Sequence, residues 1–281
     1  MNRIRIIAVL LIAMFVFSMS GAAFADVPSG VEDGVLTIAM ECAYAPYNWT
    51  QSDDSNGAVP IYGAKDFANG YDVMMAKKIA DANGWTLEIH KMDWDSIPLA
   101  VQSGAVDAGI CGQSITPERL ETMDFSDPYY FASIVTLTKA DSSFAAATGL
   151  SGLAGATCTS QINTIWYDSC LPQIENANIL AAQETAPAML VSLEAGAVDL
   201  VVTDEPTALA ACVAYPDFVL LNFAGTDDDF AVDEGDINIG ISIMKGNSEL
   251  VSRCNEVLAT MDAPVYTEIM NSAIEIQPLS E

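Results

Sequence analysis

Apolar residues along the chain form short runs separated by polar turns, a pattern that predicts alternating strands and helices. The mostly apolar run Val35 to Met40 favours a strand buried on both faces of a sheet. Asn69-Gly70 is a turn signal, Asp72 can cap a helix after it, and Asn83-Gly84 is a typical left-handed end for that helix. A strand over Trp85 to His90 and a helix over Ile97 to Gln102 follow.

The remaining segments carry weaker patterns. The polar stretch Gln51 to Asn69 indicates a loop, with a short hairpin around Ile61-Tyr62. Phe131 to Lys139 is rich in β-forming residues and suits a crossover between two lobes. The strictly alternating run Ile237 to Ile243 predicts one late strand, followed by a helix around Leu250 to Met261.

An eight-residue pattern occurs twice, 92 positions apart, at Ser103 to Ile110 and at Ala195 to Val202. Each copy follows a short helix, breaks at a glycine and enters an apolar strand with polar residues beyond its end. Ligands of open parallel sheets lie at the carboxyl ends of such strands. We therefore expect two similar α/β lobes, each directing a strand end at one cleft.

The first 25 residues are typical of a secretory leader. Arg3 and Arg5 precede the apolar run Ile6 to Phe17, and Ala23-Phe24-Ala25 fits a cleavage site before Asp26. No cysteine lies near that site, so a lipoprotein anchor is not expected. We predict an exported, periplasmic or extracytoplasmic protein, with retention of the leader as an anchor left open.

Acidic residues dominate the charge. The 281 residues hold 10 basic and 38 acidic side chains, and loss of Arg3 and Arg5 with the leader leaves 8 against 38, a net charge of −30. Such a surface repels nucleic acid and disfavours an acidic ligand. Solubility alone would also account for it.

Metal and nucleophilic chemistry have little support in the sequence. The six cysteines show no CxxC spacing and allow 15 pairings, between which the sequence does not choose. With His90 as the only histidine, a zinc site or a Ser-His-Asp triad is not indicated. We expect no metal, no cofactor and no catalytic residues.

Four motifs occur in order along the chain: Met40-Glu41-Cys42-Ala43-Tyr44-Ala45-Pro46-Tyr47, Asn69-Gly70-Tyr71-Asp72, Ser114-Ile115-Thr116-Pro117-Glu118-Arg119 and Phe125-Ser126-Asp127-Pro128-Tyr129-Tyr130. Together they resemble the polar amino-acid-binding proteins of ABC importers, the bacterial extracellular solute-binding protein family 3. The resemblance implies a two-lobed type II periplasmic-binding-protein fold. Each lobe would be a mostly parallel sheet flanked by helices, with two crossover strands as the hinge.

The expected organisation is a signal peptide at 1–25, lobe 1 at 26–135, lobe 2 at 136–237, and a return to lobe 1 with a C-terminal helix at 238–281. The resemblance implies a monomer that binds a free amino acid, polar and possibly cationic, closes on it and delivers it to a membrane permease. Two alternatives stay open: a dehydratase-like enzyme on the same fold, with Glu41 or Glu205 as acid or base, and a partner of a sensory receptor.

The ends of the ligand have expected partners in both lobes. Arg119 matches the arginine that takes the α-carboxylate, since a guanidinium binds a carboxylate with two hydrogen bonds. A salt bridge to Glu118 or Glu121 is its alternative role. Ser114 and the backbone of Gly112 match strand-end positions that hydrogen-bond the carboxylate and ammonium groups of the ligand, and Ser114 could also cap a helix.

Asp204 matches the acid that holds the α-ammonium, and a buried ammonium needs such a partner. Its alternative role is that of a helix cap before Pro206. In the other strand-end segment of lobe 2, relatives carry a Gly-Thr-Thr or Gly-Thr-Ser turn. Here Asn163 stands at the glycine and can adopt left-handed geometry, Thr164 keeps one hydroxyl, and Ile165 replaces the second.

The ligand side chain has three expected neighbours. Tyr44 and Trp94 match positions that flank it, where an aromatic ring stacks on flat groups or contacts a cation. Core packing is the alternative for both, and Tyr47 is assigned to the core or the rim. Glu41 lies where several relatives carry an acid, which would favour arginine, lysine or histidine.

Overall fold

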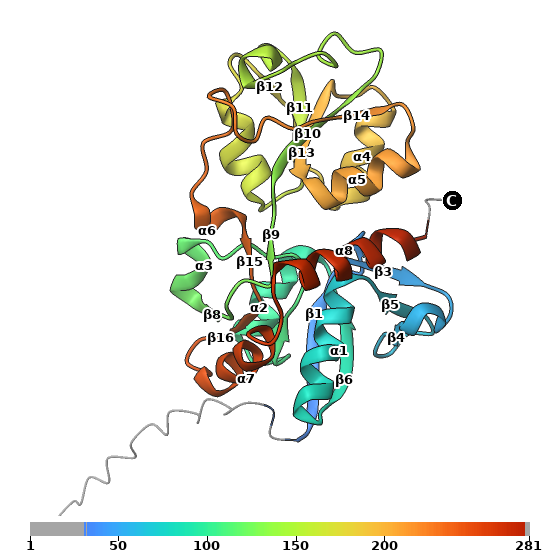
Figure 1. Cartoon of the computed structure of the whole chain (residues 1–281), viewed down its shortest axis with the longest axis vertical. Helices are drawn as coiled ribbons and strands as arrows, with labels where there is room; N and C mark the ends of the chain where they lie inside the picture. The colour runs from blue at the N-terminus through green and yellow to red at the C-terminus, as the bar shows by residue number, and fades with distance from the viewer. Residues whose placement is uncertain (1–30, 32, 279–281) are drawn as a thin grey trace, which may run out of the picture.

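The computed structural model describes residues 31 and 33–278, so the predicted leader lies outside the described residues. Two α/β lobes lie one above the other, joined by narrow connections (Figure 1). No helix in the described part of the chain is long and apolar enough to cross a membrane.

Lobe 1 is built on a five-stranded sheet of order β6-β1-β7-β16-β8. Its strands are β1 (Val35–Met40), β6 (Thr86–Lys91), β7 (Ala108–Gly109), β8 (Met123–Phe125) and β16 (Ser242–Met244). Its helices are α1 (Tyr71–Asn83), α2 (Ile97–Gln102), α3 (Pro117–Thr122), α7 (Ser248–Leu258) and α8 (Ala263–Ile276), with a short 3₁₀ turn η2 (Trp94–Ser96).

Lobe 2 repeats this plan with the sheet order β12-β11-β13-β10-β14. Its strands are β10 (Ile134–Lys139), β11 (Thr157–Thr159), β12 (Asn178–Ile179), β13 (Leu200–Asp204) and β14 (Phe218–Leu221). Its helical segments are η3 (Leu150–Leu153), η4 (Trp166–Cys170), η5 (Leu171–Gln173), α4 (Ala186–Glu194), α5 (Glu205–Ala214) and the short α6 (Glu234–Ile237), which precedes the return to lobe 1.

In each sheet one strand runs against the other four, β16 in lobe 1 and β10 in lobe 2. Both are the strands by which the chain enters from the other lobe. The two connecting segments pair as a small antiparallel sheet of β9 (Tyr130–Phe131) and β15 (Asn238–Ile239). This arrangement confirms the mostly parallel sheets and the two crossovers.

The repeated sequence pattern corresponds to a repeated structure. Gly104 and Gly196 have φ values of 71° and 68° and end equivalent helices before β7 and β13. Asp107 Oδ2 accepts a hydrogen bond from the backbone N–H of Thr37 at 2.8 Å, and Asp199 Oδ2 accepts one from Thr157 N–H at 2.8 Å. The two copies thus tie equivalent strands together in the two lobes.

Three local predictions are wrong. Asp72 does not cap α1, because Gly70 is the N-cap residue, while the Asp72 carboxylate is buried and accepts from Asn48 and Tyr129. The run from Ile237 is split at Gly240, where the chain passes from the hinge into the sheet of lobe 1. The stretch Gln51 to Asn69, predicted as a loop, contains β4 (Val59–Pro60) and β5 (Phe67–Asn69), which pair as a hairpin around Ile61-Tyr62 as expected. With β2 (Ala43–Tyr44) and β3 (Asn48–Gln51) they form a four-stranded antiparallel sheet, and the turn η1 (Ser55–Gly57) lies between β3 and β4.

Other local predictions are confirmed. Gly84 ends α1 in the left-handed conformation, and β1 and α2 have the predicted bounds. Tyr47 is fully buried in the core. The sequence left the pairing of the six cysteines open, and in the structure all six are free thiols, five of them buried.

Candidate functional site

The carboxyl ends of strands from both lobes meet between the sheets. Glu41 follows β1, Gly112 lies shortly after β7, Gln161 follows β11, and Asp204 is the last residue of β13. This is the edge at which open α/β sheets bind ligands. Nine residues of the two lobes line a small cavity there: Tyr44, Trp94, Gly112, Ser114, Arg119, Gln161, Thr164, Ile165 and Trp166.

The lobes are closed on one another at this cavity. About 10 Å³ of it is open to the centre of a water molecule, close to the space that one water requires. Hydrogen bonds join the two lobes beside it, for example from Asn163 Nδ2 of lobe 2 to Asp95 Oδ1 of lobe 1 at 2.7 Å. An amino acid can therefore enter only when the lobes separate.

Arg119 lies under an aromatic ring with its guanidinium turned to the cleft. The α3 helix that carries it is capped by Thr116, not by Ser114, because Thr116 Oγ1 accepts from Arg119 N–H at 3.3 Å. Its Nη1 donates to the carbonyl of Ser114 at 2.9 Å, and its Nη2 donates to the carbonyl of Asn163 at 3.0 Å. The guanidinium carbon lies 5.8 Å from the Trp94 ring centroid, within the range of a cation–π contact.

No carboxylate among the described residues forms an ion pair with Arg119, neither Glu118 nor Glu121. Burial lowers the pKa of its guanidinium, because the charged form loses hydration. Two neutral carbonyls therefore hold a partly buried cation. A carboxylate that replaced the Asn163 carbonyl would supply the missing opposite charge.

Asp204 has the helix-cap role considered for it, and its carboxylate also meets lobe 1. As the N-cap of α5, its Oδ1 accepts from Thr207 N–H at 2.9 Å, and its Oδ2 accepts from the Thr207 hydroxyl at 2.9 Å. The Tyr44 hydroxyl of lobe 1 also donates to Oδ2. The carboxyl is 1% exposed, and burial raises its pKa. Hydroxyls and one N–H surround this acid, with no cation paired to it among the described residues.

Glu41 is an incompletely satisfied polar group at the site. Its side chain is buried, Oε2 accepts from Gln161 Nε2 at 3.2 Å, and Oε1 has no hydrogen-bond partner among the described residues. Burial raises the pKa of this carboxyl to about 7. An unpartnered buried oxygen of this kind costs about 1–3 kcal/mol of stability, so it marks a place where a donor is expected.

Gly112 allows Tyr44 to approach the backbone. A Cβ at Gly112 would lie 2.7 Å from Tyr44 Cε1, and its φ of 69° is in the left-handed region. Gly112 N–H donates to the Tyr129 hydroxyl at 3.1 Å, so a core contact already occupies this donor. Tyr44 in turn stacks on Tyr47, with 4.9 Å between the ring centroids.

We predict that Gly112→Ala destabilises the protein by about 2 kcal/mol or more, since left-handed strain and a side-chain clash act together. Gly196→Ala is the matched control, because its φ is 68° but nothing lies within 4 Å of the added Cβ. Urea unfolding of both variants measures the difference. Equal losses would show that the Tyr44 contact contributes nothing.

The predicted site residues fall into two groups. Tyr44, Trp94, Gly112, Ser114, Arg119 and Thr164 line the cavity, whereas Glu41, Asn163 and Asp204 lie just behind it and contact lining residues. Asn163 has the expected left-handed φ of 56°. Thr164 Oγ1 donates to the carbonyl of Gln161 at 2.7 Å, which orders the turn after β11.

Three residues that line the cavity were not predicted as site residues: Gln161, Ile165 and Trp166. Gln161 could have been found, because it follows the carboxyl end of β11 as Glu41 follows that of β1. Ile165 and Trp166 carry no polar signal and face the cavity only through tertiary packing. Within the described residues, no group of three or more His, Cys, Asp or Glu side chains could hold a metal ion.

Known proteins of similar sequence and structure share this architecture. The family model described as bacterial extracellular solute-binding proteins, family 3, matches residues 36–274. The arginine-binding extracellular protein ArtP of Bacillus subtilis is 32% identical over 139 residues, 49% of this chain and 48% of that protein. A probable histidine-binding protein of Neisseria gonorrhoeae is 27% identical over 238 residues, 83% of this chain and 80% of that protein.

Among solved structures, an amino acid ABC transporter substrate-binding protein of Streptococcus pneumoniae bound to L-arginine superposes with a TM-score of 0.74. The two chains are 26% identical, and the match covers 87% of this chain and 95% of that one. Family, fold and cleft agree, and the family consists of transport components rather than enzymes. The chain therefore belongs to the bacterial extracellular solute-binding proteins, family 3, and is an amino-acid-binding protein of an ABC transporter.

Proposed function

We propose that the protein captures an amino acid with a cationic side chain and delivers it to its permease. The observation that carries this proposal is Glu41, a buried carboxyl with a free Oε1 at the junction of the lobes. Arg119 would bind the α-carboxylate and Asp204 the α-ammonium, while Glu41 would receive the side-chain cation. Tyr44 and Trp94 would flank the aliphatic part of that side chain.

The acidic lining of a neighbouring cavity also supports a cationic ligand. A cavity of about 690 Å³ lies beside the ligand cavity and shares Trp94, Arg119 and Thr164 with it. Against the one arginine it carries five carboxylates: Asp95, Glu118, Glu121, Asp168 and Asp236. A cleft lined by one sign of charge concentrates ligands of the opposite sign and speeds their association.

Closure would exchange internal bonds for ligand bonds. The ammonium would take the place of the Tyr44 hydroxyl on Asp204, and the carboxylate would take the place of the Asn163 carbonyl on Arg119. We propose that lobe 1, residues 26–135 and 238–281, moves against lobe 2, residues 136–237, by bending at β9 and β15. Both charge-assisted contacts then lie in a dry site, where they are strongest.

A thermal-shift screen of the twenty common amino acids tests the proposal. Arginine, lysine or histidine should raise the melting temperature in a concentration-dependent way, because a ligand that binds only the folded state stabilises it. Glutamate and aspartate should have no effect. A shift confined to apolar or acidic amino acids would contradict the role of Glu41.

We predict that Asp204→Ser separates capping from ligand binding. Serine is a good N-cap, so the free energy of unfolding should change by about 1 kcal/mol or less. Loss of the carboxylate should weaken amino-acid binding by at least about 30-fold, the lower range for truncating a buried charge pair. Asp262→Ser, at the exposed cap of α8, is the control and should bind normally in calorimetry. Normal binding by Asp204→Ser would remove Asp204 from the site.

A further inference from the structure

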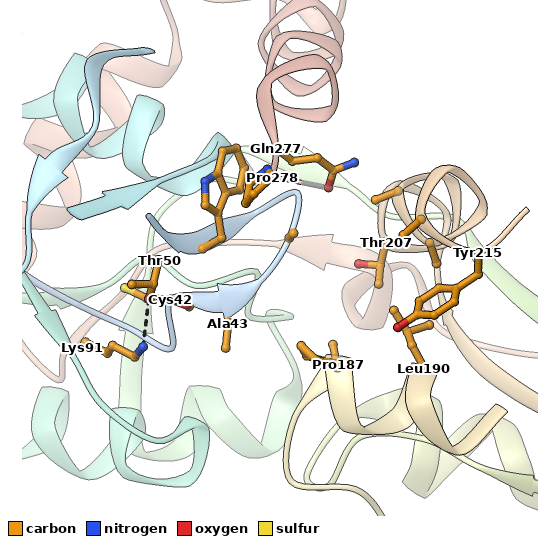
Figure 2. Close-up of a pocket in the computed structure, with 16 residues that line it drawn as sticks. Cys42, Ala43, Thr50, Lys91, Pro187, Leu190, Thr207, Tyr215, Gln277 and Pro278 are labelled. Atoms are coloured by element: carbon orange, nitrogen blue, oxygen red, sulfur yellow. Dashed lines mark hydrogen bonds between the residues drawn. The ribbon is translucent and has the colours of Figure 1, made fainter. Parts of the chain in front are cut away.

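A second cavity lies between the lobes, separate from the amino-acid site. Its volume is about 320 Å³, and it shares no lining residue with the cavity at Arg119. That volume is in the range of pockets that hold small organic ligands. Figure 2 shows one wall from lobe 1 with Ala43 and Cys42, facing a wall from lobe 2 with Pro187, Leu190 and Tyr215.

Apolar groups make up most of these walls. Lobe 1 contributes the segment between β1 and β3 and the buried Trp49 of β3, and lobe 2 contributes one face of α5 from Thr207 to Ala214. Gln277 and Pro278, which follow α8, close the third side (Figure 2). An apolar molecule held here would touch both lobes at once.

The charge of this cavity is opposite to that of the whole chain. Its lining includes one basic residue, Lys91, and no Asp or Glu, although acids outnumber bases by 38 to 10 in the sequence. Lys91 is exposed at the end of β6, and its Nζ donates to Thr50 Oγ1 at 2.8 Å (Figure 2). An ammonium has three protons to donate, so Lys91 can hold Thr50 and a carboxylate together.

We propose that this cavity is a second ligand site, which takes an amphipathic monocarboxylate with its apolar part between the lobes and its carboxylate on Lys91. The site goes beyond the proposed function, because neither its walls nor its ligand class belongs to the amino-acid cleft. It is linked to that cleft through Thr207, which lines this cavity and also holds both carboxylate oxygens of Asp204.

Occupancy of this site should favour closure. A ligand that contacts both walls binds better when the lobes are together, and it shifts the population toward that state. Amino-acid binding also favours this closed state. Each ligand should therefore raise the affinity of the other by the same factor, about fivefold or more.

Phenylacetate is the probe, with phenylacetamide as its uncharged match. Titration of the full-length protein without any amino acid, followed by calorimetry or ligand-observed NMR, should detect phenylacetate binding. Since this measurement needs no amino acid, its failure is distinct from a failure of the proposed function. Absence of phenylacetate binding would overturn the second site.

Two pairs of variants locate the probe. Lys91→Met should weaken phenylacetate by about three- to fivefold, as expected for an exposed charge pair, and leave phenylacetamide unchanged. Lys77→Met, on an exposed face of α1, should change the affinity for neither probe.

The second pair tests the cavity itself. Ala214→Trp fills the cavity and should abolish binding of both probes, whereas Val213→Trp, at an exposed neighbouring position of α5, should not. Equal effects within either pair would overturn the site.

The same assay tests two other possible occupants of this cavity, the protein's own C-terminus and a second copy of the chain. A chain shortened to end at Pro278 removes Leu279, Ser280 and Glu281. If phenylacetate binds only to the shortened chain, the natural occupant is the protein's own terminus and the proposal is wrong. If phenylacetate disperses a dimer in sedimentation, a second copy occupies the cavity and the proposal is also wrong. Arginine titrations with saturating phenylacetate then test the coupling, which an unchanged affinity would disprove.

Discussion

Arg119→Ala should abolish measurable amino-acid binding while the fold remains intact. The guanidinium is held by the carbonyls of Ser114 and Asn163 and by the Trp94 ring, without an acidic partner among the described residues. Its loss removes the only cation we assign to the ligand carboxylate and would leave that carboxylate buried and unpaired. Truncation of such a pair costs about 2–5 kcal/mol, or roughly 30- to 5,000-fold in affinity.

The folded protein should tolerate this change. Arg119 donates hydrogen bonds to two carbonyls, and its own backbone N–H closes the cap of α3 whatever the side chain. Arg253→Ala is the matched control, since it removes an equal charge from an exposed ion pair with Glu249 on α7. Calorimetry should give wild-type affinity for the control and no heat for Arg119→Ala. Circular dichroism should be unchanged for both, and retained affinity in Arg119→Ala would refute its role.

Arg119→Lys distinguishes charge from geometry. Lysine keeps the positive charge but cannot offer two parallel donors to a carboxylate. We expect binding weaker than wild type by about tenfold or more and stronger than in Arg119→Ala. A lysine variant equal to wild type would show that the site uses a point charge alone.

Sequence reasoning brought together residues that lie at one cavity, but it did not describe the contacts between them. The resemblance selected Asp204 and Glu41 as candidates, and the repeated pattern placed Asp204 at a strand end, where the carboxyl ends of parallel strands share one edge. The sequence could not show that Tyr44 of lobe 1 donates to Asp204 of lobe 2. That contact depends on lobe closure, and no local pattern encodes the angle between the two lobes.

The fold predictions failed where tertiary contacts override local propensity. Aspartate is a common helix cap, yet the Asp72 carboxylate is buried and accepts hydrogen bonds from Asn48 and Tyr129 instead. The alternation from Ile237 to Ile243 is regular, but the chain must change sheets at Gly240, since a hinge segment and a core strand belong to different layers. The second cavity had no sequence signal, because Ala, Pro and Leu at its walls look like ordinary core residues.

Glu41→Gln should change both the selectivity and the pH dependence of binding. In the wild type, burial raises the pKa of Glu41 to about 7, so the carboxyl is protonated below that pH and ionised above it. A cationic side chain binds the ionised form, and its binding below pH 7 must release a proton. Arginine affinity should therefore be constant above pH 7 and fall by up to about tenfold per pH unit below it.

Other groups titrate nearby, and the variant separates them from Glu41. Lys91, Asp93 and Asp95 act electrostatically on Glu41, and burial raises the pKa of Asp72 to about 6 and that of Asp204 as well. These groups remain in Glu41→Gln. Titrations of arginine and of its uncharged analogue citrulline between pH 5.5 and pH 8.5 isolate the Glu41 contribution as the difference between variant and wild type.

The variant should bind citrulline about as well as arginine, whereas the wild type should prefer arginine by about tenfold or more at pH 8. In the protein without ligand, the pH dependence of folding stability runs in the opposite direction to that of arginine affinity. Because the pKa of Glu41 is higher in the folded state than in the unfolded chain, its stabilising contribution is complete near pH 4 and is lost as the pH rises through 7. In urea unfolding, Glu41→Gln should not show this decrease in the free energy of unfolding as the pH rises through 7. A wild-type arginine affinity that is flat from pH 5.5 to pH 8.5 would show that no ionised Glu41 meets the ligand.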